Sequence, residues 1–321
     1  MISPLSSRHW MYRSINLSAT RRLISQYRVS SHVSSRRKMT LAAAGQFCAT
    51  ASMAENLASV KTLIHKSVEM GAKALFLPEA SDYIAGSPAE TVALAKSIDQ
   101  SEFVLGIQEE LRKLDAPLEV SVGIHESVEN EDRCKNVLLW VNSRGEVTQQ
   151  YQKLHLFDVN LKHGPILMES KSVQPGQEVL PPFDTCLGRI GYAICYDIRF
   201  PEHALRLRTL GADIITYPSA FTVRTGQAHW ELLGRARAVD TQTYVIMPAQ
   251  VGAHDPEGKR RSWGHAMIID PWGTVLAQCP DTDSLPRICV ADIDLEVVAK
   301  VRTDMPLWQQ RRGVPVYGYD V

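Results

Sequence analysis

Short apolar runs separated by polar turns recur along the chain from residue 40 onwards, and their lengths are typical of β-strands. In the first half they predict strands over residues 40–48, 73–77, 118–124, 136–142 and 146–151. In the second half they predict strands over residues 188–195, 213–217, 243–249, 265–270, 274–278 and 287–292. Residues 143–145 predict a hairpin turn, and residues 271–273 predict a second turn between neighbouring strands.

Helical patterns lie between several of these runs. A capping box over residues 52–55 predicts the start of one helix, because its side chains satisfy free backbone N–H groups, and Gly71 ends it. Pro201 begins a second helix, since proline is tolerated in the first turn, and Gly211 ends that one. A further helix is expected within residues 90–114. Strands and helices in alternation predict a layered α/β fold.

A short sequence pattern occurs once in each half of the chain. Residues 71–80 read GAKALFLPEA and residues 211–220 read GADIITYPSA, so each contains a helix stop, a buried strand and a Pro-x-Ala turn. This similarity predicts two related halves, in each of which a helix is followed by a strand. No low-complexity linker follows residue 38, so residues 39–321 are expected to form one domain.

The formal net charge is zero, but basic residues are concentrated at the N-terminus. Residues 1–38 hold eight lysines and arginines, many serines and no acidic residue. This composition is typical of a mitochondrial transit peptide, and the segment lacks the uninterrupted apolar core of a secretory signal. We therefore expect residues 1–38 to direct the protein to mitochondria, and initiation at Met39 would produce a cytoplasmic form.

The composition of the remaining chain excludes several classes of partner. From Met39 onwards there are 27 basic and 35 acidic residues, and this net charge of −8 disfavours binding to nucleic acid. No stretch reaches the ~20 apolar residues of a membrane-spanning helix, so no membrane partner is expected. None of the six cysteines has C-x-x-C or zinc-finger spacing, and no G-x-G-x-x-G or P-loop pattern is present. Neither a metal nor a cofactor is therefore expected.

Three polar residues that follow apolar runs are candidates for chemistry. Glu79 comes at the end of a buried strand, where desolvation is expected to raise its pKa and make it a general base or acid. Lys153 follows another strand, and near a reacting carbonyl it would stabilise a developing oxyanion. Cys195 lies between a strand and the helix predicted at Pro201, a position that exposes nucleophiles and favours the thiolate. Taken singly, each also fits an ordinary alternative: a loop glutamate, a surface lysine and an inert buried cysteine.

Together, the segments FLPEA around Glu79, YQKLHLFD around Lys153 and ICYDIRFPE around Cys195 resemble the signature of the nitrilase, or carbon–nitrogen hydrolase, superfamily. The resemblance runs from about Met39 to Arg312 and is strongest to the Nit branch of that superfamily. Further matching segments cover residues 217–221, 228–237 and 264–273. The resemblance implies a four-layer α-β-β-α sandwich, which dimerises through its helices into a homodimer.

The resemblance also implies roles for the site residues. Glu79 would take the proton of Cys195, whose thiolate attacks an amide carbonyl, while Lys153 and the backbone N–H of Tyr196 stabilise the oxyanion. Glu79 would then protonate the leaving amine and activate the water that hydrolyses the thioester. Glu169 would orient the lysine or the substrate. Arg199 would clamp a substrate carboxylate, because a guanidinium binds a carboxylate through two parallel hydrogen bonds. Other substrate-binding candidates are Tyr83, Tyr196, Phe221 and Thr222.

The implied substrate is a small-molecule amide, deaminated glutathione, which is the 2-oxo analogue of glutathione left by mistaken transamination. Its hydrolysis would give 2-oxoglutarate and cysteinylglycine, a repair of a damaged metabolite. Two alternatives stay open: an ω-amidase that releases ammonia from 2-oxoglutaramate, and a non-catalytic dimeric scaffold. A papain-like hydrolase would need a histidine base, but His155, His229 and His265 lie in no recognisable protease motif. A serine hydrolase would need G-x-S-x-G, which is absent.

Overall fold

The computed structural model describes residues 40–160, 166–312 and 316, all within the compact unit Met39–Val321. Segment 1–38 lies outside the described residues, so its role as a transit peptide stays a prediction. None of the described helices is both long enough and apolar enough to cross a membrane.

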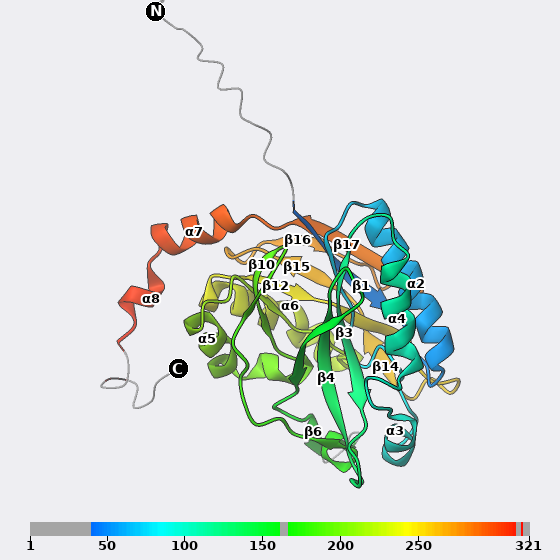
Figure 1. The fold of residues 1–321 in the computed structure, drawn as a ribbon. Helices are drawn as coiled ribbons and strands as arrows, with labels where there is room; N and C mark the ends of the chain where they lie inside the picture. Colours follow the sequence, from blue (N-terminus) through cyan, green and yellow to red (C-terminus); the bar gives the residue numbers. More distant parts are fainter. Residues whose placement is uncertain (1–39, 161–165, 313–315, 317–321) are drawn as a thin grey trace, which may run out of the picture. The chain divides into compact units, whose positions relative to one another are not determined.

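The first sheet has nine strands, and its main path runs β14-β13-β1-β2-β3-β4-β5. Beside this path, β17 pairs antiparallel with β1, and β8 pairs parallel with β4. The strands are β1 (Leu41–Phe47), β2 (Ala74–Phe76), β3 (Glu119–Glu126), β4 (Cys134–Val141), β5 (Val147–Gln152), β8 (Val173–Gln174), β13 (Ala249–Ala253), β14 (Arg261–Trp263) and β17 (Arg287–Asp292). Helices α2 (Met53–Glu69) and α4 (Glu102–Arg112) pack on its outer face, and the short α3 (Pro88–Leu94) precedes α4 (Figure 1).

The second sheet has six strands in the order β16-β15-β12-β11-β10-β9. They are β9 (Phe183–Thr185), β10 (Gly188–Tyr192), β11 (Ile214–Thr216), β12 (Tyr244–Met247), β15 (Met267–Ile269) and β16 (Val275–Gln278). Helices α5 (Pro201–Thr209) and α6 (Val223–Thr241) pack on its outer face. The smaller elements are β6 (Asp158–Asn160), β7 (Ile166–Met168), the 3₁₀ turns η1 (Glu169–Lys171) and η2 (Cys195–Arg199), α7 (Leu295–Asp304) and α8 (Leu307–Gln310).

Aromatic side chains join the two sheets across the centre of the molecule. Phe76 and Trp140 on the first sheet pack edge to face at 5.8 Å between ring centroids. Trp140 in turn contacts Phe183 of the second sheet at 5.5 Å, and Phe183 contacts Tyr192 at 5.0 Å. Such pairs stabilise a core by about 0.5–1.5 kcal/mol each beyond the burial of their surface. The order helix, sheet, sheet, helix confirms the four-layer α-β-β-α sandwich.

The topology repeats, as the sequence pattern predicts. In the first half β1, β2 and β3 are parallel and β4 and β5 are antiparallel additions. In the second half β10, β11 and β12 are parallel and β15 and β16 are antiparallel additions. Gly71 and Gly211 occupy equivalent places before β2 and β11, with φ of 76° and 95°. Only glycine adopts this backbone without strain, which is why both copies of the pattern begin with it.

Two predicted strands have other boundaries in the structure, and one helix was not predicted. The strand expected over 188–195 ends at Tyr192, because the chain turns into η2 at Cys195. The run 243–249 is two strands, β12 in the second sheet and β13 in the first, since Pro248 between them has no N–H for a ladder. The hydrophobic pattern missed α6 altogether. Its buried face includes Gly226, Gly234 and Arg237, and a Cβ at Gly234 would lie 2.2 Å from the sulfur of Met247.

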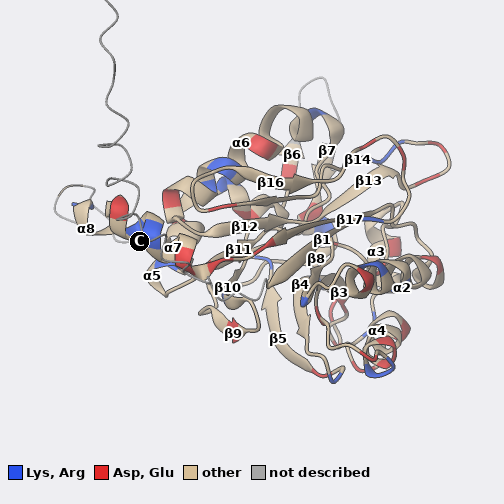
Figure 2. Cartoon of the chain, turned by 90° about the horizontal axis from the view of Figure 1, so that it is seen from above, with Lys and Arg blue, Asp and Glu red and all other residues tan. Residues whose placement is uncertain are grey.

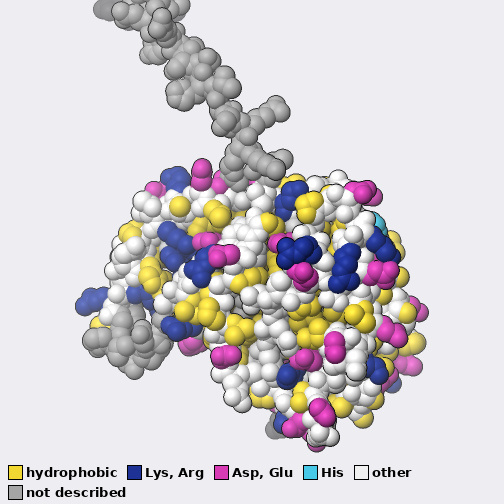
Figure 3. All heavy atoms as spheres, in the orientation of Figure 1, with side chains coloured by type: hydrophobic (Ala, Val, Ile, Leu, Met, Phe, Trp, Pro, Cys, Tyr) yellow, Lys and Arg dark blue, Asp and Glu magenta, His cyan; other side chains and the backbone are white. Residues whose placement is uncertain are grey.

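Charged side chains of both signs are interspersed over the helices and loops (Figure 2). On the face in Figure 3, acidic and basic side chains alternate with small apolar areas. A phosphate backbone needs a continuous basic surface, which this face does not offer. The expectation of no nucleic-acid partner stays a prediction for the chain as a whole.

Candidate active site

Glu79 lies in the turn that directly follows β2, with its neighbour Ala80 in the left-handed region at φ 52°. The residue is only 5% exposed. Its Oε1 accepts hydrogen bonds from Lys153 Nζ at 2.8 Å and from Asn136 Nδ2 at 2.8 Å. Its Oε2 accepts from the backbone N–H of Ala220 at 3.0 Å. These donors replace the water that burial removes, so the carboxylate can remain charged.

Lys153 follows β5 and is 1% exposed between two carboxylates. Its Nζ donates to Glu79 and, at 3.0 and 2.8 Å, to both carboxylate oxygens of Glu169. Glu169 begins η1 and also accepts from the backbone N–H of Phe157 at 2.7 Å and from Asn136 at 3.1 Å. The predicted second glutamate is therefore placed directly on the lysine, which it orients.

Cys195 is the first residue of η2, and its backbone φ of 46° is one that side-chain-bearing residues rarely adopt. Its N–H donates to the carbonyl of Pro218 at 3.0 Å. Asp197 fixes the turn, because its Oδ2 accepts from the N–H of Ile194 at 2.9 Å and from the hydroxyl of Tyr151 at 2.7 Å. The turn thus holds the thiol beside Glu79, with 8% of the residue exposed.

The carboxylate and the ammonium of this cluster are charged, and the thiol is neutral. Burial raises the pKa of the Cys195 thiol, the charge and hydrogen bond of Glu79 raise it further, and Lys153 only partly opposes them. Burial alone would raise the pKa of Glu79, but the charge and hydrogen bond of Lys153 and the hydrogen bonds of Cys195 and Asn136 together hold it below its ordinary 4.5. Burial alone would lower the pKa of Lys153, but Glu169 and Glu79 keep it well above 10.5.

Two sequence-based expectations about these groups are therefore wrong. The pKa of Glu79 does not rise toward neutrality, because Lys153, with the hydrogen bonds from Cys195 and Asn136, outweighs desolvation. Cys195 is not a preformed thiolate, because burial and the neighbouring carboxylate favour the thiol. What the structure contains is a carboxylate hydrogen-bonded to a protonated nucleophile, the arrangement that general-base catalysis requires. His155 is not that base, since its Nδ1 is engaged with Asp197 Oδ1 at 2.7 Å.

Comparison with known proteins agrees with this geometry. The carbon–nitrogen hydrolase family matches residues 41–303 of the chain. This protein belongs to the carbon–nitrogen hydrolase family. The probable hydrolase nit2 of Schizosaccharomyces pombe is 48% identical over 278 residues, which cover 86% of this chain and 99% of that protein. The deaminated glutathione amidase of Rattus norvegicus is 41% identical over 279 residues, which cover 86% of this chain and 83% of that protein.

The crystal structure of the C. elegans NitFhit protein has the same fold, with a TM-score of 0.79 and 39% identity. The match covers 85% of this chain, which spans 65% of the length of that fusion protein. As a member of the carbon–nitrogen hydrolase family, the chain is a hydrolase that acts on carbon–nitrogen bonds.

In this hydrolase, three of the predicted substrate-binding residues lie together. The guanidinium of Arg199, at the end of η2, lies 5.8 Å from the ring centroid of Tyr196 and 5.6 Å from that of Phe221. It contacts Nδ1 of His229 at 3.3 Å, and it forms no ion pair with any carboxylate in the described part of the chain. A guanidinium between two aromatic faces with no carboxylate partner is free to bind an anion.

The other two candidates serve the fold. Tyr83 is fully buried, its hydroxyl donates to the carbonyl of Thr91 at 2.7 Å, and its ring stacks on His125. It therefore has no surface left for a substrate, and its assignment to substrate binding is corrected. Thr222 immediately precedes α6, and its hydroxyl hydrogen-bonds to that of Thr225 at 3.0 Å. This contact explains Thr222 as part of the start of the helix.

Sequence reasoning missed three groups that hold the cluster together: the Asn136 amide, the Ala220 N–H and the Asp197 carboxylate. Asn136 bridges both glutamates from β4, where an asparagine inside an apolar run was the available signal. Ala220 occupies the place in the second copy of the repeated pattern that Ala80 has in the first. Asp197 lies two residues after the nucleophile and is fully buried, which nothing in its local sequence indicates.

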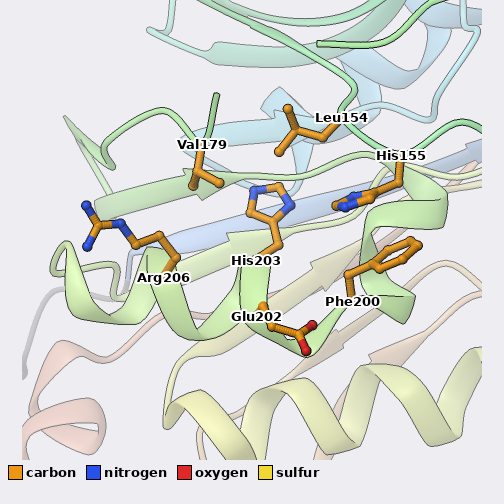
Figure 4. A pocket seen from close by; sticks show the side chains of 7 residues that line it. All are labelled: Leu154, His155, Val179, Phe200, Glu202, His203 and Arg206. Atoms are coloured by element: carbon orange, nitrogen blue, oxygen red, sulfur yellow. The ribbon is translucent and has the colours of Figure 1, made fainter. Parts of the chain in front are cut away.

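A hollow of about 540 Å³ lies next to this cluster but contains none of its four reactive residues (Figure 4). It is lined by Leu154, His155, Val179, Phe200, Glu202, His203 and Arg206. Among the described residues, the group His155, Asp197 and His203 has ligand atoms near enough to hold a metal ion. However, Asp197 already accepts four hydrogen bonds, from Tyr151, from Ile194 and twice from His155. We interpret the group as a support for η2, and the expectation of no metal stays a prediction.

Proposed function

We propose that this hydrolase is an amidase that converts deaminated glutathione and water into 2-oxoglutarate and cysteinylglycine. The observation that carries the proposal is the buried cluster of Cys195, Glu79, Lys153 and Glu169, in which a protonated thiol faces an ionised carboxylate. The substrate is supported by the relatives of the chain, one of which is the rat deaminated glutathione amidase at 41% identity.

In the first half of the reaction, Glu79 takes the thiol proton as the sulfur of Cys195 attacks the amide carbonyl carbon. The negative charge that forms on the carbonyl oxygen is stabilised by the ammonium of Lys153 and by the backbone N–H of Tyr196. The protonated Glu79 then gives its proton to the amine nitrogen, the C–N bond breaks, and cysteinylglycine leaves. The acyl group remains on the sulfur as a thioester.

In the second half, Glu79 takes a proton from water, whose oxygen attacks the thioester carbonyl. The C–S bond breaks, the proton returns to the sulfur of Cys195, and 2-oxoglutarate leaves. Lys153 keeps its proton throughout, because Glu79 and Glu169 hold its pKa well above 10.5. It acts as a fixed positive charge and Glu79 as the only proton carrier.

Arg199 is the residue that we assign to the 2-oxo acid carboxylate of the substrate. It lies four residues after the nucleophile, between Tyr196 and Phe221, and it has no carboxylate partner among the described residues. This carboxylate is present both in deaminated glutathione and in 2-oxoglutaramate. Arg199→Ala is therefore expected to lower kcat/KM for both substrates by about 10- to 100-fold, the loss typical of a charged hydrogen-bonding partner.

The proposal is tested with purified enzyme, deaminated glutathione and 2-oxoglutaramate, following cysteinylglycine and ammonia separately. Release of cysteinylglycine with the far higher kcat/KM supports the proposal. Preferential release of ammonia would make the protein an ω-amidase with the same cluster. No release of either product, or a cellular role that survives Cys195→Ala, would favour the non-catalytic scaffold.

We further propose that the protein is a homodimer that pairs through the outer face of α6. Leu232 and Val239, seven residues apart on this helix, are 65% and 44% exposed, and Trp272 in the adjoining turn is 59% exposed. Apolar side chains grouped in this way on a surface are typical of an interface. Sedimentation is expected to show a dimer, which Leu232→Glu dissociates. The matched control is Leu105→Glu on α4, where a leucine is 43% exposed on the opposite side of the sandwich.

A further inference from the structure

The hairpin of β13 and β14 carries a basic run, residues 259–261, that has no place in the reaction described above. Its loop also bears acidic residues, so that it shows both colours in Figure 2. Asp255 fixes the loop, because its carboxylate accepts from the backbone N–H groups of Lys259 at 3.0 Å and Arg260 at 2.7 Å. The N–H of His254 closes it by donating to the carbonyl of Arg260 at 2.9 Å.

The hairpin is attached to the segment that borders the site. The N–H of Trp263 donates to the carbonyl of Phe221 at 2.9 Å, and Ser262 forms a bridge with Thr222. The side chain of Trp263 packs against Gly226 of α6, where an added Cβ would approach its ring to 2.1 Å. The base of the loop is therefore fixed beside Phe221, one of the residues around Arg199.

The two arginines of the run have different electrostatic partners; Arg260 lies in the bend that precedes β14, and Arg261 is the first residue of that strand. Arg261 interacts electrostatically with Cys48, away from the reaction. The guanidinium of Arg260 interacts with Glu79, Glu169 and Cys195. Burial of the guanidinium lowers the pKa of Arg260 below its ordinary value, and these three groups oppose that shift, Glu79 most strongly. The residue as a whole still has exposed surface, so a bound molecule can reach it.

The charges of the site show why a cation is needed there. Glu79, Glu169 and Lys153 together have a net charge of −1, and deaminated glutathione carries a carboxylate at each end. Such a substrate is repelled by the cluster unless other positive charges compensate. Arg199 provides one such charge. Arg260 provides a second, because among the described residues it forms no ion pair that would neutralise it.

The attachment of the hairpin and the role of Arg199 indicate which end of the substrate Arg260 meets. The hairpin that carries Arg260 is bonded to the Phe221–Thr222 segment at the edge of the site, and Arg199 is already assigned to the 2-oxo acid carboxylate, which leaves Arg260 for the carboxylate at the other end. We propose that Arg260 binds the terminal carboxylate of the cysteinylglycine leaving group and so selects a peptide amide over a simple amide. The inference rests on the proposed function and adds to it a residue that determines specificity.

The first test compares Arg260→Ala with Arg261→Ala, the neighbouring arginine, whose electrostatic partner is Cys48. For deaminated glutathione, Arg260→Ala is expected to lower kcat/KM by about 10- to 100-fold, mainly through KM, since a charged hydrogen bond is lost. For 2-oxoglutaramate, which lacks the terminal carboxylate, kcat/KM is expected to stay within about threefold of wild type. Arg261→Ala is expected to leave both values near wild type.

The second test removes the substrate carboxylate that Arg260 is proposed to bind, instead of the arginine. Deaminated glutathione whose glycine carboxylate is replaced by a carboxamide is expected to be a poorer substrate for the wild type by the same factor. Arg260→Ala is expected to hydrolyse the acid and the carboxamide equally well, because the pair is already broken. This comparison also shows that the variant is folded, since its activity on the carboxamide should equal that of wild type.

The outcomes separate the inference from the proposed function. A wild-type enzyme that does not hydrolyse deaminated glutathione contradicts the function itself. With an active wild type, an equal loss on both substrates would place Arg260 at the acyl end or in the reaction itself, and would overturn the inference. An Arg260→Ala enzyme that still prefers the acid to the carboxamide would overturn it as well.

Discussion

Glu79→Gln separates the two effects that the structure assigns to this carboxylate: holding the proton on Cys195 and moving it during the reaction. The substitution preserves the shape and removes the charge. Oε1 faces two donors, Lys153 and Asn136, so the amide oxygen is expected on that side. The NH₂ group then faces the N–H of Ala220, which loses its acceptor. That unpaired donor is expected to reduce the free energy of unfolding by about 1–3 kcal/mol.

The charge itself has a larger effect on the thiol. A unit charge about 4 Å away at an effective dielectric constant of about 20 contributes about 4 kcal/mol, which corresponds to about three pKa units. In wild type this interaction raises the pKa of Cys195, whereas Lys153 lowers it. In Glu79→Gln only the lysine remains, still charged through its contacts with Glu169. The pKa of Cys195 is therefore expected to fall, while turnover falls by about 10²–10⁴-fold because no group carries the proton.

The assay is the rate of alkylation of Cys195 by iodoacetamide between pH 6 and 9, with the modified residue identified by mass spectrometry. Cys195→Ser provides the background from the other five cysteines. At pH 7 we expect the Glu79→Gln enzyme to be alkylated at least about tenfold faster than wild type, since its thiolate fraction is larger. If alkylation and turnover decrease together, Glu79 activates the thiol in the free enzyme, and the reasoning from its charge is refuted.

The remaining predictions concern the cation, pH, metals and targeting. Lys153→Ala is expected to lower the rate at least ~10²-fold, and to lower the free energy of unfolding in urea by about 3–5 kcal/mol because two buried carboxylates lose their counter-charge. The folded-state pKa of Glu79 is below its ordinary 4.5, so its contribution to stability is present at neutral pH and is lost as pH falls through that lower value. Activity and melting temperature, measured against pH, should therefore be insensitive to this group from pH 5 to 8, whereas a Glu79-dependent loss of activity within that range would contradict the depressed pKa. EDTA is expected to leave kcat unchanged, and a loss that zinc restores would contradict the interpretation of His155, Asp197 and His203. Residues 1–38 fused to a fluorescent protein are expected to direct it to mitochondria, and a diffuse signal would contradict the transit prediction.

Much of the fold follows from local patterns. Ser52 predicts the start of α2, and its side chain does accept from the N–H of Glu55 at 3.4 Å. Pro201 and Gly211 enclose α5 as expected, and Gly145 forms the predicted hairpin turn between β4 and β5 with φ of 71°. Caps, turns and strand periodicity depend on neighbours in the chain, which is why the sequence alone is sufficient for them.

The helix α6 shows where local patterns fail. Its buried side contains two glycines because Trp263 and Met247, from other parts of the chain, approach it closely, and it also contains Arg237, which donates to the carbonyl of Ile198. A hydrophobicity pattern therefore does not predict a helix with such a buried surface. The prediction that Tyr83 binds substrate was wrong for the same reason. Its position in the sequence near Glu79 does not indicate that its side chain is completely buried.

The sequence alone identified Glu79, Lys153 and Cys195 as the site residues and gave their order along the chain, because each lies in a local motif. Their protonation states were decided by the tertiary structure. The bond between Lys153 and Glu79 joins residues 74 positions apart, and with the hydrogen bonds from Cys195 and Asn136 it reverses the effect of burial on the pKa of the glutamate. The electrostatic role of Arg260 likewise exists only because the hairpin of β13 and β14 packs against the segment around Phe221. Interactions between charges depend on distances in space and on the removal of water, and neither quantity can be obtained from local sequence patterns.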